Sequence, residues 1–389
     1  MNAVPTGPAT DPDPEALAWR DSGLLDLHAP RTRNQTVPAG ALARLTRVGE
    51  RIDLTARDFD CETTTDVVAL LLARAQHVDA RGSGQVSVGG SARLLRASDD
   101  WIAVNLARPD DVTLFPAWLG CAIPDDDPWP VLVAAVADRR ATDVVATGQD
   151  LGVPVAVVGP SDDDALRERH PGSVHPWLVD GPAPDATPVR EPLVVDFSSL
   201  WAGPLCARLL RAGCGARVMK VESTRRPDGA RAGSPGFYAA LHDGDETVTV
   251  DFGSADGRET LQALVARADV VIEGSRPRAL TQLGLSPASG RAAHPGQVWT
   301  SITAYGRTGS WSNRVGFGDD TAAAGGLVAW TNGEPAFLGD AIADPITGAL
   351  AALATLTALA RGGGVTIDVA LRDAACWTAG GRHPTRVRI

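Results

Sequence analysis

The carboxylate of Asp344 is the side chain of this sequence whose position best suits covalent catalysis. It stands in the segment GDAIADPITG, residues 339–348, directly before Pro345 and an alanine- and leucine-rich stretch. An aspartate before a proline commonly begins a helix, so we expect Asp344 to be a helix N-cap. The partial positive charge of a helix amino end keeps a carboxylate ionised and stabilises a developing oxyanion. The sequence therefore predicts a cap that can also act as a nucleophile.

The motifs of several other enzyme classes are absent. The first strand of the later half is followed by SSLWAGP, residues 198–204, and not by the GxGxxG that binds a dinucleotide, which disfavours a nicotinamide-dependent oxidoreductase. There is no GxxxxGK[ST] for a phosphate loop and no GxSxG for a serine nucleophile. The seven histidines lack HExxH and HxH spacing, so we expect no metal site. Cys206 and Cys214 lie on a helical pattern, and we expect both thiols to be buried in packing.

The elements that must position these residues are a series of short strands and helices after residue 190. Apolar runs of strand length alternate there with longer amphipathic patterns, which is typical of a parallel sheet with helices on both faces. Such sheets bind ligands at the carboxyl ends of their strands, so we expect the chemistry in the loops that follow them. The expected strands are residues 192–197, 216–222, 247–252, 269–273 and 298–304, and the expected helices are 203–211 and 254–268.

The first half of the chain predicts a different architecture. Helical and strand patterns follow one another there without a regular alternation, which is typical of a small α+β domain. The helical patterns are residues 64–76 and 129–136, and the strand patterns are 85–88, 93–96 and 101–107.

A proline-rich and acidic stretch, residues 159–192, separates the two halves. Such composition is typical of a connection between domains, and we place the boundary near Pro188. We therefore predict an α/β protein. A Rossmann-like parallel-sheet domain covers residues 186–389, and a smaller α+β domain covers 1–185.

Charge is distributed unevenly between these halves. The whole chain has 36 basic and 47 acidic residues and a net charge of −11, which argues against nucleic acid or an anionic membrane surface as the main partner. Residues 1–189 hold 16 basic and 28 acidic residues, hence −12, and residues 190–389 hold 20 and 19, hence +1. The acidity of the whole chain thus does not exclude an anionic small substrate in the later half.

Several features predict a cytoplasmic protein. The five cysteines are scattered without CxxC spacing, so neither a zinc site nor a disulfide framework is indicated. Residues 1–14 lack the basic-then-apolar order of a signal peptide, and we expect a loose tail. The longest apolar stretch, residues 349–360, is shorter than the roughly 20 residues that span a bilayer.

The order of segments from Pro192 to Trp377 resembles the class III CoA-transferase family, which includes formyl-CoA transferase, carnitine CoA-transferase and α-methylacyl-CoA racemase. Since residues 1–185 resemble the small-domain portion that family members carry late, the chain is similar to a rearranged member. The resemblance covers about half of the chain. It is carried by VVDFSSLWAGPLCARLLRAGCGARVMKVE (194–222), VDFGSADGRETLQALVARADVVIEGSRPRALTQLGL (250–285), SITAYGRTGSW (301–311) and GGGVTIDVALRD (362–373).

The resemblance implies that Asp344 is the nucleophile, because the family's catalytic aspartate opens the corresponding helix. It implies transfer of CoA between an acyl-CoA and a carboxylic acid through an aspartyl-CoA thioester. It also implies an interlocked homodimer and no permanently bound cofactor, with CoA and acyl-CoA as substrates. The expected CoA-binding residues are Ser199, Leu200, Trp201, Ala202, Gly203, Lys220, Arg225, Arg226, Arg276, Arg278 and Phe317.

Two departures from the family pattern define the alternatives. In LHDGDET, residues 241–247, Asp243, Asp245 and Glu246 stand where the family has a basic segment that helps to hold CoA. The alternative is therefore a catalytically inert relative that acts as a CoA-binding or partner subunit. Racemisation is disfavoured, because FGDD, residues 317–320, lacks the histidine that the racemases carry there as a second acid or base.

Overall fold

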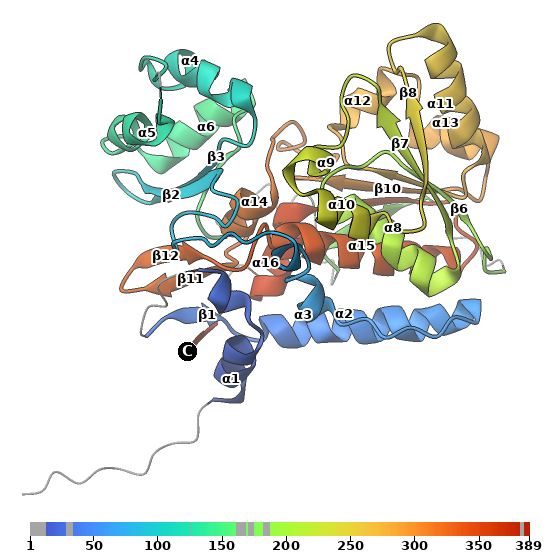
Figure 1. Cartoon of the computed structure of the whole chain (residues 1–389), viewed down its shortest axis with the longest axis horizontal. Coiled ribbons are helices and arrows are strands. Elements are labelled where there is room, and N and C mark those ends of the chain that lie inside the picture. The colour runs from blue at the N-terminus through green and yellow to red at the C-terminus, as the bar shows by residue number, and fades with distance from the viewer. Residues whose placement is uncertain are drawn as a thin grey trace, which may run out of the picture.

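The computed structural model describes residues 13–28, 34–124, 126–160, 169, 175–181, 187–381 and 385–389. Figure 1 shows a large body around one sheet, a smaller lobe beside it and a second, antiparallel sheet below that lobe. The predicted loose tail lies outside the described residues up to residue 12, as does much of the predicted connection at 159–192. The architecture is mixed α/β, as predicted.

A seven-stranded sheet forms the centre of the larger body in the described part of the chain. Its strand order is β5-β13-β10-β9-β6-β7-β8, in which β5 is antiparallel to β13 and the other neighbours are parallel. Successive residues face opposite sides, so Val194 and Val195 pack in different cores. The strands are β5 (Trp177–Asp180), β6 (Leu193–Asp196), β7 (Arg217–Ser223), β8 (Glu246–Val250), β9 (Val270–Glu273), β10 (Val298–Thr303) and β13 (Thr366–Ala370).

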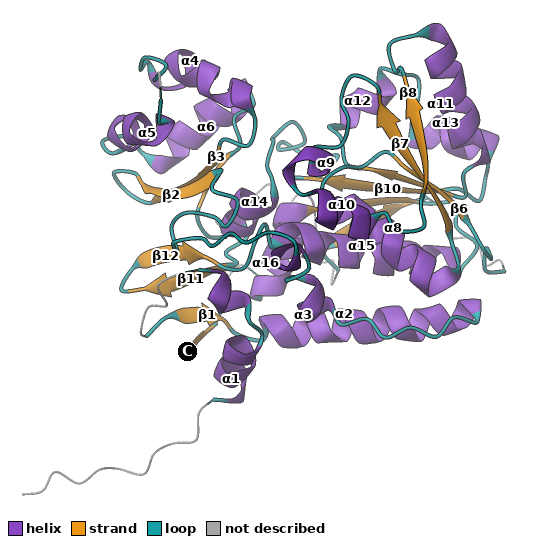
Figure 2. Cartoon of the chain, in the orientation of Figure 1, coloured by secondary structure: helices purple, strands orange, loops and turns teal. Residues whose placement is uncertain are grey.

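Helices cover both faces of this sheet (Figure 2). α8 (Ala202–Cys214) and α15 (Ala343–Leu359) pack on one face, and α11 (Ala255–Arg267) with α13 (Pro287–Ala293) on the other. The predicted burial of Cys206 and Cys214 in α8 is confirmed, and burial raises the pKa of the Cys214 thiol to about 12. Further helices of the body are α9 (Ala230–Gly233), α10 (Pro235–Leu241), α12 (Pro277–Thr281), α14 (Gly318–Ala324) and α16 (Leu371–Ala379).

The amino-terminal segment packs against the later half of the chain. α2 (Ala41–Ala56) shares the core of α8 and α15 and runs beneath them (Figure 1). β1 (Thr36–Pro38) lies between strands of the second half in a four-stranded antiparallel sheet of order β12-β11-β1-β14. The other elements here are α1 (Pro14–Asp21), α3 (Val67–Leu70), β11 (Val328–Thr331), β12 (Glu334–Phe337) and β14 (Arg386–Arg388). The proposed boundary near residue 186 stays a prediction.

The smaller lobe is a three-stranded antiparallel sheet, β2-β3-β4, covered by three helices with their own core. α14 of the body contacts its strands β3 and β4, so the lobe borders the carboxyl-end loops of the large sheet. The lobe elements are β2 (Ala92–Arg96), β3 (Trp101–Asn105), α4 (Phe115–Leu119), α5 (Pro128–Val136), α6 (Ala141–Leu151) and β4 (Val155–Val157).

Two expectations for the first half are wrong. Residues 64–76 do not form one helix, because the bonds from Leu72 N to Ala69 O and from Ala73 N to Leu70 O are tight turns that end α3 early. Residues 85–88 do not form a strand. Val86 makes only an isolated bridge with Arg93 there, and the chain then turns back to begin β2.

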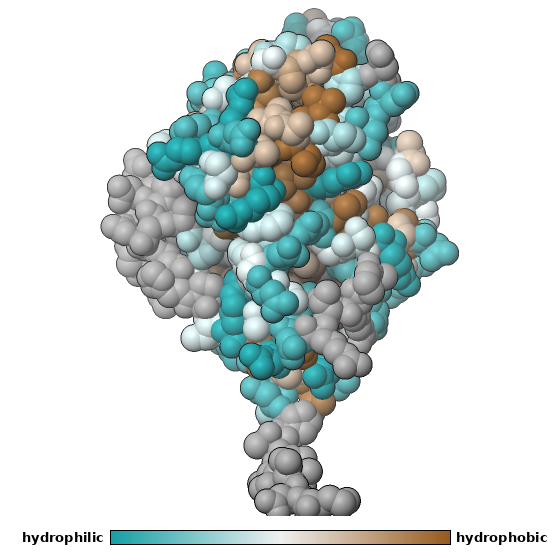
Figure 3. All heavy atoms as spheres, turned by 90° about the vertical axis from the view of Figure 1, so that its left-hand side faces the viewer, coloured by the Kyte–Doolittle hydropathy of each residue, from teal (hydrophilic) through white to brown (hydrophobic). Residues whose placement is uncertain are grey.

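The surface of the lobe carries an apolar strip (Figure 3). Val133 of α5 is 50% exposed, and Ile123 before that helix is 49% exposed. Within the described residues, no helix has the length and apolarity needed to traverse a bilayer.

Candidate active site

A cavity of about 400 Å³ lies beyond the carboxyl end of β6, between the sheet body and the lobe. Four of the residues expected from the sequence line it: Leu200, Trp201, Phe317 and Asp344. The structure thus brings the candidate nucleophile and the turn after β6 to one cavity. The other lining residues are Arg74, Gly89, Ser91, Asn105, Ala107, Arg108, Gly229, Ala230, Gly233, Ser234, Phe237, Gly318, Asp319 and Ala341.

The turn after β6 is held by a buried charge network beneath it. Lys220 is fully buried, with Nζ 3.5 Å from Asp196 Oδ2 and 3.4 Å from Asp228 Oδ2, and it donates a hydrogen bond to the carbonyl oxygen of Ser198. The N–H of Leu200, whose φ is 68°, donates to the Asp228 carboxylate at 3.1 Å. Lys220 therefore lies below the turn and does not line the cavity.

Three other residues of the turn also lie away from the cavity. Ser199 is exposed, and Ala202 is buried at the start of α8. A Cβ atom at Gly203 would stand 1.9 Å from Ser198 Oγ, so no larger residue fits there without movement of the turn. Gly203 thus allows the turn to close, and its backbone is not exposed to the cavity.

Asp344 lies in the first turn of α15, one residue after its start. α15 begins at Ala343, and its N-cap is Ile342 without a side-chain hydrogen bond, so the predicted N-cap role of Asp344 is wrong. The reason is the loop before it. Ala341 has a φ of 44°, and its carbonyl oxygen accepts the N–H of Asp344 at 2.9 Å. The helix therefore starts before Asp344 and leaves its carboxylate at the cavity wall.

The electrostatic surroundings of Asp344 favour its neutral form. Burial raises its pKa to about 8, with the charges of Asp319, Asp320 and Asp340 acting in the same direction and that of Arg74 opposing them. The helix amino end was expected to keep this carboxylate ionised. The structure contradicts that expectation for the free protein, because desolvation and the charges of three neighbouring carboxyls raise the pKa of Asp344.

Asp319 and Asp320 at the start of α14 are functional candidates that the sequence analysis missed. Asp319 lines the cavity and accepts the N–H of Ala341 at 2.9 Å. Asp320 accepts the N–H of Phe317 at 2.9 Å and Asn105 Nδ2 at 3.1 Å. Burial raises the pKa of each to about 7. Two adjacent acids after a glycine were the available signal, and alone they indicate only a helix start.

Arg74 supplies the cation of this carboxylate cluster. Its Nε donates to Asp340 Oδ2 at 2.6 Å, and Nη2 donates to the other oxygen, while the Asp340 side chain is 1% exposed. The two residues are 266 positions apart, and nothing in the sequence around Arg74 marks it. Its role comes from the fold alone.

The expected arginines divide into two sets. Arg276 lies close to Arg226, Arg278 and the cavity-lining Arg108, and after partial burial these three charges lower its pKa. This lowering of the Arg276 pKa indicates a concentration of positive charge around Arg276. Arg225 instead lies 3.6 Å from the Asp251 carboxylate, with its side chain 76% exposed.

Two acids of residues 241–247, Asp245 and Glu246, form local ion pairs. Asp245 pairs with Arg211 at 3.1 Å and with the ring of His242 at 2.8 Å. Glu246 pairs with Arg217 at 3.1 Å. None of these residues lines the cavity beside Asp344, so their negative charges do not face it.

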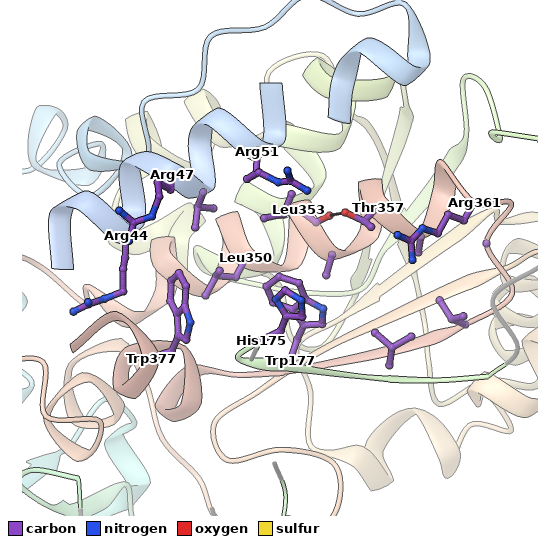
Figure 4. A pocket seen from close by; sticks show the side chains of 16 residues that line it. Arg44, Arg47, Arg51, His175, Trp177, Leu350, Leu353, Thr357, Arg361 and Trp377 are labelled. Atoms are coloured by element: carbon purple, nitrogen blue, oxygen red, sulfur yellow. Dashed lines mark hydrogen bonds between the residues drawn. The ribbon is translucent and has the colours of Figure 1, made fainter. Parts of the chain in front are cut away.

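A second cavity, of about 500 Å³, lies between α2 and α15. Figure 4 shows Arg44, Arg47 and Arg51 of α2, with Arg361 after α15, around a floor formed by the apolar face of α15. None of the expected site residues lines this cavity.

In the part of the chain that is described, no group of three or more His, Cys, Asp or Glu side chains is arranged to hold a metal ion.

Comparison with known proteins decides the family. The profile of CoA-transferase family III matches residues 190–387, which is half of the chain. The chain belongs to CoA-transferase family III. Its match includes β6, the turn after it, α14 and the start of α15, and therefore most of the elements around Asp344.

The chain is 30% identical to one curated relative, the succinyl-CoA–D-citramalate CoA-transferase of Chloroflexus aurantiacus. This identity covers 48% of this chain and 50% of that protein. It is 32% identical to the succinate–glutarate CoA-transferase of Agrobacterium fabrum over 46% of this chain and 50% of that protein. A CAIB/BAIF family protein from Brucella suis is similar in structure, with a TM-score of 0.46 and 33% identity over 50% of this chain and 56% of that one. The chain thus spans about half the length of the relatives it matches.

Proposed function

We propose that this family member transfers CoA between an acyl-CoA and a carboxylic acid, with Asp344 as the nucleophile. The observation that carries the proposal is that Asp344 and Trp201 line one cavity of about 400 Å³. That cavity lies beyond the carboxyl end of β6, where parallel sheets place their ligands. Phe237, edge-on to Trp201 with ring centroids 4.9 Å apart, gives it an apolar wall for the acyl group.

In the first half-reaction, a carboxylate oxygen of Asp344 attacks the thioester carbonyl carbon of the donor. The C–S bond breaks, and CoA leaves as a thiolate from an acyl-aspartyl mixed anhydride. The thiolate then attacks the aspartyl carbonyl carbon, and the donor acid leaves as its carboxylate. The product is an aspartyl-CoA thioester, so CoA is held covalently while the acids exchange.

The second half-reaction runs the same bonds in reverse. The acceptor carboxylate attacks the aspartyl thioester and releases the CoA thiolate, which then attacks the acceptor carbonyl of the new anhydride. The new acyl-CoA leaves, and Asp344 is regenerated as a carboxylate. The amino end of α15 stabilises the oxyanion that forms at the aspartyl carbonyl when the CoA thiolate or the acceptor carboxylate adds to it.

We propose that Arg108, Arg226, Arg276 and Arg278 bind the phosphate groups of CoA. Arg108 lines the cavity of Asp344, and its charge acts on Arg276 together with those of Arg226 and Arg278. This cluster takes the place of the basic segment that the chain lacks at 241–247. Roles for Ser199, Lys220 and Arg225 in CoA binding stay predictions.

The cation cluster makes CoA affinity depend on Arg276. We expect Arg276→Leu to weaken CoA binding about tenfold or more in isothermal titration calorimetry, because it removes charge-assisted hydrogen bonds to phosphate. Arg267→Leu, an exposed arginine at the end of α11, is the matched control and should keep the affinity of the unchanged protein. Equal affinities for both variants would contradict the placement of CoA.

Chemical trapping tests the covalent step. The protein is incubated with an acyl-CoA and then with hydroxylamine, which converts an aspartyl thioester or anhydride to a hydroxamate. Tandem mass spectrometry should locate the modification at Asp344, and Asp344→Ala should remove it. Modification at another residue, or an equal yield in the variant, would refute the nucleophile.

Proton binding at Asp344 sets the expected pH dependence. The residue must be ionised to attack and its pKa is raised to about 8, so kcat/KM should rise with pH through that value. Asp319→Asn removes a neighbouring negative charge and should move the midpoint of the profile to lower pH by about one pH unit. Asp256→Asn on the surface of α11 is the control. A midpoint that stays in place or rises for Asp319→Asn would contradict this account.

The second candidate function, a catalytically inert subunit that binds CoA or a partner, is favoured by one observation. The chain spans about half the length of its relatives. Calorimetry with free CoA, combined with the trapping experiment, separates the two: binding without trapping supports the inert subunit. A homodimer and a cytoplasmic location stay parts of the proposal, and sedimentation equilibrium tests the former.

A further inference from the structure

Arg372, in the first turn of α16, is a buried cation whose guanidinium has no hydrogen-bond partner among the described residues. Its side chain is 1% exposed, and it is among the largest fully buried side chains of the described residues. Nε, Nη1 and Nη2 are all buried, and none of them donates a hydrogen bond to a described residue. A guanidinium stays charged in a protein, so its buried donors require acceptors.

The carboxylate beside Arg372 is engaged elsewhere. Asp373 Oδ1 lies 3.6 Å from Nη1, beyond hydrogen-bond distance. Asp373 Oδ2 accepts Arg169 Nε at 2.7 Å, and Arg169 Nη1 donates to Asp368 at 2.6 Å. Both carboxylates are thus directed to Arg169, and the fork of Arg372 points to no protein acceptor among the described residues.

Arg372 lines a small cavity between the body and the lobe. The cavity has a volume of about 150 Å³, and its walls include Tyr305 and Trp311 from the loop after β10 and Ala156 of β4. The Tyr305 hydroxyl is also buried without a hydrogen-bond partner among the described residues. Burial raises the pKa of this phenol, so it remains a neutral O–H donor.

Aromatic rings complete the surroundings of the cation. The guanidinium carbon of Arg372 lies 5.5 Å from the Trp311 ring centroid, and that of Arg314 lies 3.8 Å from the same centroid. Both arginines line the cavity. Two cations and a phenolic donor line this small space, and none of its described lining residues is a carboxylate. It is therefore a donor-rich pocket, which is the complement of an anion.

We propose that this pocket binds a small oxyanion, either inorganic phosphate or a short carboxylate, through the guanidinium fork of Arg372 and the hydroxyl of Tyr305. Two coplanar oxygens of such an ion match the paired N–H donors of an arginine. The charge of the anion would compensate the Arg372 cation, because the one carboxylate beside it, Asp373, is shared with Arg169. A water molecule would accept a hydrogen bond but would leave the charge without compensation.

This oxyanion pocket is separate from the cavity of Asp344. The two share no lining residue. α14 connects them, since Asp319 at its start lines the Asp344 cavity and Ala324 at its end lines the oxyanion pocket. An ion here would join the body to the lobe, because β4 and α6 of the lobe form part of the wall.

Isothermal titration calorimetry of the full chain tests the proposal. Sodium phosphate and sodium acetate are titrated separately at constant ionic strength. We expect saturable binding of at least one of them, with a stoichiometry of one at the Arg372 pocket. Arg372→Leu should weaken that binding about tenfold or more, and Tyr305→Phe should weaken it by a smaller factor. The anion that binds more tightly identifies the ligand class.

Two matched controls keep this pocket distinct from the proposed CoA site. Arg267→Leu should bind the anion like the unchanged protein. Arg276→Leu, which removes a cation of the proposed CoA cluster, should weaken only the binding of phosphate to that cluster, so a loss of anion affinity in Arg276→Leu but not in Arg372→Leu would also overturn the proposal. If neither anion shows saturable binding, or if Arg372→Leu binds as tightly as Arg267→Leu, the proposal is overturned. If Arg372→Leu does not fold, as judged by circular dichroism, Tyr305→Phe carries the test: unchanged affinity in that variant would then overturn it.

Discussion

Replacing Asp344 by alanine is expected to reduce the turnover number for CoA transfer by about 10⁴-fold or more. In the proposed mechanism this carboxylate forms both the anhydride and the thioester, so its loss removes the covalent route. CoA affinity should stay within a few-fold, because the arginines proposed to bind its phosphate groups are untouched. A coupled assay of acyl-CoA formation measures turnover, and calorimetry measures affinity.

The control for this substitution is Asp256→Ala. Asp256 is the second residue of α11, just as Asp344 is the second residue of α15. Unlike Asp344, Asp256 is exposed. Both substitutions remove an acid from the first turn of a helix, so a loss that comes only from the helix dipole would appear in both. A turnover number for Asp344→Ala within tenfold of the unchanged protein would refute Asp344 as the nucleophile.

Replacing Arg74 by methionine should lower the free energy of unfolding by about 3 kcal/mol. Arg74 pairs with Asp340, which is buried, and its charge also opposes the raised pKa of Asp344. Without it, the pKa values of Asp319 and Asp344 rise further in the folded state. A carboxyl whose pKa is higher in the folded than in the unfolded protein stabilises the folded state fully below its unfolded pKa, near 4. That stabilisation is lost as the pH rises toward the folded pKa. The deficit should therefore be larger at pH 8 than at pH 5.

Urea unfolding at both pH values measures this effect. The control is Arg190→Met, because Arg190 pairs with Asp60 at the surface, with both side chains more than half exposed. Such a pair contributes about 0–1 kcal/mol. Adding Asp340→Asn to Arg74→Met should recover part of the stability, since no buried charge is then left unpaired. A deficit that is the same for both arginines and independent of pH would contradict the carboxylate cluster.

The sheet was predictable because its signal is local. The expected strands 216–222 and 298–304 correspond to β7 (Arg217–Ser223) and β10 (Val298–Thr303). Their alternation with helices required a parallel sheet, and a parallel sheet places its ligand loops at one edge. The same argument points to the turn after β6, whose Trp201 lines the cavity beside Asp344.

The expectation of a helix over 64–76 failed because tertiary contacts overrode a local pattern. Leu71 is fully buried and Arg74 reaches Asp340, 266 residues away, and the backbone tightens into short turns that place both. Local propensity contributes at most a few tenths of a kcal/mol per residue, less than a buried ion pair and a core leucine. Sequence periodicity therefore could not decide this segment.

The sequence by itself determined the parallel sheet, the helix that carries Asp344 and the resemblance to a CoA-transferase, because each depends on residues close together in the chain. Only the tertiary structure decided the protonation of Asp344. The groups that set its pKa, Asp319, Asp340 and Arg74, come from separate segments. Burial and charge act through space, and distances through space are fixed only when those segments fold together.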